Sequence, residues 1–174
     1  MGCNNSTPEP PCECVQSLTA VDAPLMAFLS KTRAAHHQAD QREESGDIAG
    51  AIRALESITS TQLGRTASRP EAKEVLADTQ ARLADLQGQL GNYEDAEKSV
   101  SQGLKLAPRD SFFEGHLYEM RGVNEERRSK ALAELGDKVG AEAAKQKALS
   151  AFDKVIDIQE RVIRRELADA GGAP

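Results

Sequence analysis

Three short segments of this chain resemble one another and recur at a fixed interval of 45 residues. Their glycines are Gly46, Gly91 and Gly136, each is followed by Asp or Asn, and an alanine stands five residues after each glycine. Self-similarity at a period of this size is typical of arrays in which each unit is one supersecondary structure and the units stack side by side. The chain is therefore expected to be an array of similar units.

The residue types of the repeated segment predict a tight turn between two helices. Glycine ends a helix by adopting a left-handed conformation at little steric cost. The Asp or Asn that follows it is expected to cap the next helix by accepting a hydrogen bond from a free backbone amide. Because the turn is short, the two helices must run antiparallel, and the small alanine is expected where they cross closely.

The composition favours an all-α fold. The chain is rich in good helix formers, lacks Trp and contains only two Tyr and four Phe among 174 residues. We therefore expect an all-α protein of three stacked antiparallel helix hairpins. The six helices are expected at about 22–45, 47–61, 68–90, 92–107, 110–135 and 138–168.

Two of these helices raise questions of local detail. Ser68 and Glu71 have the spacing of a capping box, which predicts that they open the third helix. In the sixth helix, Lys145 falls where an apolar residue belongs. Two extra helical turns or a lengthened loop would reconcile this position with the repeat.

The second unit resembles a tetratricopeptide repeat. The resemblance lies in Ala84, the run Gly91-Asn92-Tyr93-Glu94-Asp95-Ala96, and a later Ala-Pro pair at 107–108. The period is longer than the 34 residues usual for that family, and the added length falls in the first helix of each unit. The resemblance implies units at about 22–63, 68–108 and 110–168. The Gly- and Pro-containing end of the chain, at 169–174, is expected to be a disordered tail.

The first 21 residues are expected to form a flexible, Pro-rich tether that carries all three cysteines. Cys3 is suited to be the acylated cysteine of a bacterial lipoprotein, which places the protein in the bacterial cell envelope, facing the periplasm or the surface. Alternatively, Gly2 fits an N-myristoylation pattern, with Ser6 at the required spacing. If the tail is an unmodified linker, the protein is cytoplasmic. The role of Cys12 and Cys14 stays open.

Charge and motif content exclude several classes of function. The net charge of −6 argues against nucleic acid as a partner. No segment is apolar over the roughly 20 residues needed to span a bilayer, so membrane contact is expected only through a lipid anchor. No catalytic motif is present, and neither enzymatic activity nor a cofactor is expected. Metal binding by His36 and Asp40 is a remote alternative.

The expected function is that of a non-catalytic adaptor or scaffold that binds a protein segment in a concave groove. By resemblance to the family, the first helix of each unit lines this groove. Because the lining is acidic, a basic or neutral segment is expected. A structural subunit that packs into a larger assembly or self-associates is the alternative, and the oligomeric state stays open. The expected groove residues are Arg33, His36, Asp40, Glu43, Asp78, Asp85, Gln89, Glu126, Lys130 and Glu134.

Overall fold

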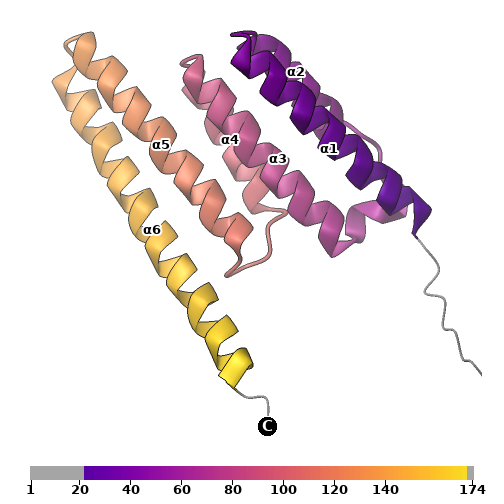
Figure 1. Cartoon of the computed structure of the whole chain (residues 1–174). Helices are drawn as coiled ribbons and strands as arrows, with labels where there is room; N and C mark the ends of the chain where they lie inside the picture. The colour runs from indigo at the N-terminus through magenta and orange to yellow at the C-terminus, as the bar shows by residue number, and fades with distance from the viewer. Residues whose placement is uncertain (1–21, 172–174) are drawn as a thin grey trace, which may run out of the picture.

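The structure is a computed structural model that describes residues 22–171, with side chains through Ala168, and every regular element in this range is a helix. Six α-helices and one 3-10 helix make up the described part of the chain (Figure 1). The all-α prediction is confirmed. The elements are α1 (Ala23–Glu44), α2 (Ile48–Thr59), the 3-10 helix (Gly64–Ser68), α3 (Pro70–Gln89), α4 (Tyr93–Leu104), α5 (Phe112–Glu134) and α6 (Lys138–Gly171).

The helices form three hairpins, α1–α2, α3–α4 and α5–α6, that stack in chain order. The first helix of each later hairpin packs on both helices of the hairpin before it: α3 contacts α1 and α2, and α5 contacts α3 and α4. Figure 1 shows this succession from the indigo α1 to the yellow α6. Each hairpin therefore covers its predecessor, as expected for a stacked array.

The three repeated glycines form the turns that join the hairpin helices. Gly46, Gly91 and Gly136 have φ values of 81°, 75° and 81°, a left-handed region in which a side chain is strained. In the first and third turns the predicted cap is present: Asp47 Oδ1 accepts from the Gly50 amide at 2.8 Å, and Asp137 Oδ1 from the Gly140 amide at 2.9 Å. Asn92 occupies the same place without a side-chain capping bond.

Small side chains fill the contacts between the helices. The repeated alanines are buried as predicted: Ala51 and Ala96 are fully buried and Ala141 is 8% exposed. Larger buried residues lie between the hairpins, among them Leu55 and Leu86 in one cluster. A core of alanine and leucine lets helices approach closely, which explains how the fold forms with so few aromatic residues.

The predicted capping box at the start of the third helix is wrong. Ser68 ends the 3-10 helix, and its hydroxyl donates to the Arg65 carbonyl at 2.9 Å. The N-cap of α3 is Arg69, in an extended conformation and without a side-chain capping bond. Pro70 follows at the first helical position, where its missing amide costs no hydrogen bond. The proline defines this helix start, and the serine hydroxyl is used by the preceding turn.

The third hairpin has the same short turn as the others, so the lengthened loop is excluded. Lys145 is exposed on the outside of α6, while the inward side of that helix carries mainly small residues. At one close approach, a Cβ on Gly122 of α5 would lie 2.6 Å from the Phe152 ring of α6. With 34 residues against 23 in α5, α6 is the longest helix. Its buried residues are Ala141, Ala144, Ala148, Ala151 and Ile158.

No helix in residues 22–171 is both long and apolar enough to cross a membrane. The predicted tether and its candidate lipidation sites, Gly2 and Cys3, lie outside the described residues, as do residues 172–174. Residues 169–171, expected to be part of a disordered tail, belong to α6.

Candidate functional site

Four of the predicted groove residues lie around Arg82 of α3. The guanidinium of Arg82 pairs with Asp40 at 3.2 Å, with Asp85 at 3.4 Å, and with Glu43. The Gln89 amide donates to Glu43 at 2.9 Å and to Asp85 at 3.1 Å. These residues, which we call the Arg82 network, use one another as partners across α1 and α3.

A second arginine extends the Arg82 network to α5. Arg127 pairs with Asp85 at 2.9 Å and donates to Asn124 at 3.0 Å. Asn124 is buried and donates to the Ala84 carbonyl at 2.9 Å. Since Arg82 and Arg127 lie among the predicted carboxylates, this face is less acidic than its predicted residues alone suggest.

Three other predicted groove residues, Arg33, His36 and Asp78, line a shallow depression of ≈ 340 Å³ between α1 and α3. The last three lie on α5. Glu126 and Lys130 are exposed and pair with each other at 2.6 Å, and this contact lowers the pKa of Glu126. Glu134 is exposed in the last turn of α5. The ten predicted residues are thus divided among three separate groups.

The His36 side chain on α1 contacts a side chain of α3. Its Nε2 lies 3.0 Å from the Thr79 hydroxyl, which itself donates to the Val75 carbonyl at 2.8 Å. Because that hydroxyl proton is already used, the contact fits the tautomer in which Nε2 carries the proton and donates to Thr79. Burial lowers the pKa of His36, against the charges of Asp78 and Asp40, which raise it.

Metal coordination by the described residues finds no support in their grouping. Among residues 22–168, no three His, Cys, Asp or Glu side chains are clustered as a metal ion would require. The Nε2 atom of His36 already contacts the Thr79 hydroxyl at 3.0 Å.

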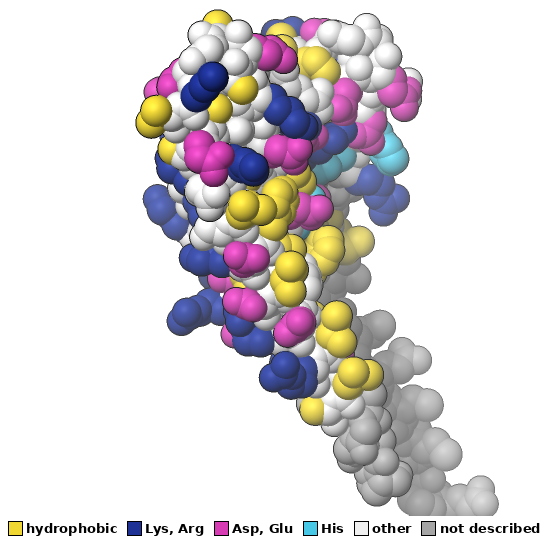
Figure 2. Space-filling model, turned by 90° about the vertical axis from the view of Figure 1, so that its left-hand side faces the viewer, with side chains coloured by type: hydrophobic (Ala, Val, Ile, Leu, Met, Phe, Trp, Pro, Cys, Tyr) yellow, Lys and Arg dark blue, Asp and Glu magenta, His cyan; other side chains and the backbone are white. Residues whose placement is uncertain are grey.

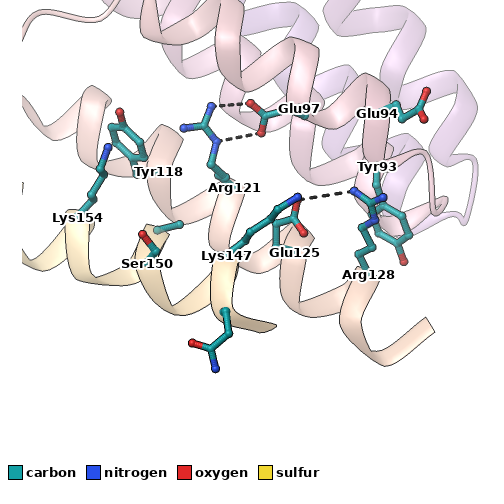
Figure 3. Close-up of a pocket in the computed structure, with 12 residues that line it drawn as sticks. Tyr93, Glu94, Glu97, Tyr118, Arg121, Glu125, Arg128, Lys147, Ser150 and Lys154 are labelled. Atoms are coloured by element: carbon teal, nitrogen blue, oxygen red, sulfur yellow. Dashed lines mark hydrogen bonds and ion pairs between the residues drawn. The ribbon is translucent and has the colours of Figure 1, made fainter. Parts of the chain in front are cut away.

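A cleft of ≈ 710 Å³ lies between α4 and α6, with α5 as its floor (Figure 3). We call it the α4–α6 cleft. It forms because α5 packs against both helices while α4 and α6 are held apart by it. Both tyrosines of the chain line it. Its lining is Tyr93, Glu94, Glu97, Tyr118, Arg121, Glu125, Arg128, Gln146, Lys147, Ser150, Ala151 and Lys154.

The floor of the α4–α6 cleft is held by an ion pair and an aromatic ring. Arg121 binds Glu97 through two hydrogen bonds of 2.9 and 2.6 Å, drawn in Figure 3. Burial by itself would lower the pKa of Arg121, but the bond to Glu97 and its charge outweigh burial and raise it. The Tyr118 ring lies 5.1 Å from the Arg121 guanidinium carbon and 4.8 Å from the Lys154 ammonium. Both distances are within the range of cation–π attraction.

A second, smaller cleft of ≈ 340 Å³ lies between α2 and α4, over α3. The 45-residue period relates three of its lining residues to three of the larger cleft: Gln80 to Glu125, Leu83 to Arg128 and Gln102 to Lys147. In the smaller cleft, Gln80 donates to Gln102 at 3.0 Å. The same positions in the α4–α6 cleft carry a carboxylate and an ammonium, so the repeat places charge where the preceding unit has amides.

Gln80 and Glu125 share a further property. Gln80 Oε1 and Glu125 Oε2 are both buried and have no hydrogen-bond partner among the described residues. The other oxygen of Glu125 lies 3.8 Å from Arg128, and the Glu125 side chain is only 15% exposed. The floor of the α4–α6 cleft therefore contains a carboxylate that is only partly compensated.

Sequence reasoning did not find the α4–α6 cleft. Tyr93 was noted only as part of the repeated segment, and Lys147 and Lys154 look like ordinary charges on a long helix. A cleft between two helices that do not pack on each other depends on tertiary placement, which the periodicity does not reveal. The concentration of both tyrosines in units two and three was the one available signal.

Comparison with protein-family models, with curated proteins and with solved structures finds no match for this chain.

Proposed function

We propose that this chain is a non-catalytic protein–protein interaction module, an adaptor whose partner segment binds in the α4–α6 cleft. The observation that carries this proposal is the lining of that cleft. Tyrosine and arginine are the residue types most enriched where interfaces have their binding energy, and Tyr93, Tyr118, Arg121 and Arg128 all occur in this one hollow. The equivalent cleft over α3 contains none of them.

We also propose that the array is a long-helix variant of the tetratricopeptide repeat. Support comes from the three left-handed glycines, the buried alanine five residues after each, and the stacking of successive hairpins. In that family, partner segments bind the face of the first helices. Here many charged side chains on that face pair with one another in the Arg82 network. This favours the α4–α6 cleft, formed by second helices, as the binding site.

The adaptor is proposed to be tethered to a bacterial envelope membrane through a lipid on Cys3, or alternatively on Gly2. The supporting observation is in the sequence alone, since neither residue belongs to the described part. Intact mass of the protein isolated from its own host tests the tether. A mass increase matching a diacyl or triacyl cysteine supports it, and an unmodified N-terminus overturns it.

The binding proposal is tested by cross-linking followed by calorimetry. A photo-reactive residue replacing Gln146 in the cleft is expected to capture a partner that the same residue at Ala34 on α1 does not. Binding of the purified partner is then measured with Ser150→Arg, which fills the cleft from α6, and with Ser30→Arg, a matched change on exposed α1.

We expect Ser150→Arg to weaken binding at least tenfold and Ser30→Arg to leave it unchanged. Arg33→Glu tests the face of the first helices. It is a better probe than charge reversal at Asp85, which is 16% exposed and needed by two arginines. If Arg33→Glu abolishes binding and Ser150→Arg leaves it unchanged, the cleft is rejected as the binding site. The groove along the first helices would then be the binding site.

A second function, self-association or packing into a larger assembly, is favoured by the outer surface of α6. Besides Val139 in its first turn, four large apolar residues of α6 are exposed, and Figure 2 shows a broken line of apolar side chains along this end of the molecule, with charged residues between. Such a line is unusual on a solvated helix. The residues are Leu149 (49% exposed), Ile156 (57%), Ile163 (58%) and Leu167 (68%).

Light scattering over a concentration series tests this second function. If α6 mediates self-association, a mass above 18.7 kDa is expected to fall to the monomer value with Ile156→Glu combined with Ile163→Glu. A monomer at all concentrations would reject self-association.

A further inference from the structure

The charges of the α4–α6 cleft are divided between its two walls. Lys147 and Lys154 stand on the α6 wall, whereas Glu94 and Glu97 stand on the α4 wall, as Figure 3 shows. The ion pairs within the lining join Arg121 to Glu97 and Arg128 to Glu125, and neither involves a lysine of α6. The α6 wall therefore offers two ammonium groups that the described residues leave without a carboxylate partner.

The charge of Glu125 on the floor of the cleft favours an anion bound along the α6 wall. Glu125 lies between the two walls on α5, and one of its oxygens is buried without a hydrogen-bond donor. A negatively charged group placed over Glu125 would meet like charge, whereas one placed along α6 would meet Lys147 and Lys154. In the preceding unit the position of Lys147 is Gln102, which is already bonded to Gln80. The corresponding α4 wall has one lysine, Lys98, but it is paired with Asp95 at 2.8 Å, so the ammonium groups without a carboxylate partner belong to the α4–α6 cleft.

The size of the cleft fits an extended chain. Its floor runs from Tyr118 to Arg128, which is about 15 Å of helix. An extended segment of about five residues covers that length, at about 3.1 Å per residue. Such a segment is narrower than a helix, which with its side chains is roughly 10–12 Å across.

We propose that the α4–α6 cleft binds an acidic, extended segment of a protein partner, with two carboxylates paired to Lys147 and Lys154. This rests on the proposed function and names the chemistry of its ligand. The two lysines are seven residues apart on one helix, so their attachment points are separated by about 10 Å. In a polyproline II segment, side chains three residues apart share one edge and are separated by about 9 Å. Acidic residues at positions i and i+3 therefore match the pair.

The chain offers a matched control for the lysine pair. Lys138 and Lys145 are also exposed, also lie on α6 and are also seven residues apart, but neither lines the cleft. Two double variants change the net charge equally. One combines Lys147→Gln with Lys154→Gln, and the control combines Lys138→Gln with Lys145→Gln. Any difference between the two double variants reports the cleft and not the overall charge of the protein.

The probe is a labelled, proline-rich peptide with two glutamates three residues apart, compared with the same peptide carrying glutamines. Fluorescence anisotropy gives the affinity, and amide chemical shifts of the full chain give the location. We expect the glutamate peptide to shift Tyr118 and Ser150. Its affinity is expected to fall about five- to thirtyfold in the Lys147/Lys154 double variant and less than about twofold in the control.

Several outcomes would overturn the acidic ligand. One is that the glutamine peptide binds as tightly as the glutamate peptide, and another is that both double variants lose the same amount of affinity. A third is that millimolar inorganic phosphate abolishes peptide binding. The last is that phosphatidylglycerol vesicles bind in a lysine-dependent way and the peptide does not bind. If the cross-linked partner binds the cleft but is unaffected by the Lys147/Lys154 change, the acidic class is wrong and the binding function stands. If no peptide and no partner shifts the cleft residues, both fail together.

Discussion

The two sides of α5 differ in whether the charged side chains around them have ion-pair partners. On the side that faces α3, Arg127 joins the Arg82 network, in which carboxylates of α1 and α3 already have arginine partners. On the side that faces α4 and α6, Arg121 takes one glutamate, and the two lysines of the α6 wall are left without one. A surface whose charges satisfy one another stabilises the packing of its helices. A surface whose charges lack partners leaves them available to a ligand.

The largest expected effect is a difference in stability between variants of Arg82 and Arg121. Arg82→Ala removes three ion pairs from side chains that are partly buried, and we expect it to lower the free energy of unfolding by about 1–2 kcal/mol. Arg121→Ala removes one pair to a half-exposed glutamate and should cost about 0.5–1 kcal/mol. Urea denaturation of both variants measures the difference, and equal losses would show that the Arg82 network has no special structural role.

A change between α5 and α6 should affect the cleft but leave the Arg82 network unchanged. In Gly122→Ala the added Cβ meets the Phe152 ring, and overpacking of this kind costs about 1–3 kcal/mol. The better helix propensity of alanine offsets about 1 kcal/mol of this cost, so a net loss of about 1 kcal/mol is expected. Amide shifts should move along the cleft and stay unchanged at Asp40 and Gln89. Shifts of equal size on both sides would contradict the separation.

A smaller effect is expected from pH on the side of α1 and α3. Since burial lowers the pKa of His36 in the folded state, the unfolded chain binds a proton first as the pH falls below about 6.5. Stability should therefore be fully present above that pH and decline below it. His36→Gln should remove this part of the decline, whereas His37→Gln, an exposed neighbour, should retain it. The midpoint of urea unfolding between pH 7.5 and 5.5 provides the measurement.

The smallest expected effect is on the stability of the lysine variant. Lys147 and Lys154 make no ion pair with the described residues, and Lys154 has only an exposed cation–π contact to Tyr118, so their replacement by glutamine should lower the free energy of unfolding by no more than about 0.5 kcal/mol. Thermal unfolding alongside the Lys138/Lys145 control checks this. A clear loss of stability would mean that the lysines serve the fold, and the contrast between the two sides of α5 would be lost.

The fold could be predicted because its signals are local. A glycine that must be left-handed, an aspartate that caps the next helix and an alanine where helices cross are each defined within a few residues, and Gly46, Asp47 and Ala51 all behave as expected. The start of α3 could not be predicted in the same way. Ser68 and Glu71 have the right spacing, but the 3-10 helix before them uses the serine hydroxyl first.

The candidate site was less predictable than the fold because it depends on which helices meet. Asp40 and Asp85 were placed on the correct helices, but their partner Arg82 projects from α3 toward α1, which spacing along one helix does not indicate. Lys147 and Tyr93 are 54 residues apart in the chain and line one cleft only because α5 separates α4 from α6. Contacts of this kind follow from the assembled array.

The repeated turn has a consequence for how such a chain can evolve. Each turn depends on its own glycine and the next few residues, so a unit of 45 residues can be duplicated or lost without changing the remaining turns. A cleft arises between the second helices of two successive units, so three units give two clefts, and one more unit would add a third. Duplication would supply the new cleft with its shape already formed. Substitutions at the positions of Gln80, Leu83 and Gln102 would then give it a ligand of its own, as Glu125, Arg128 and Lys147 distinguish the existing pair.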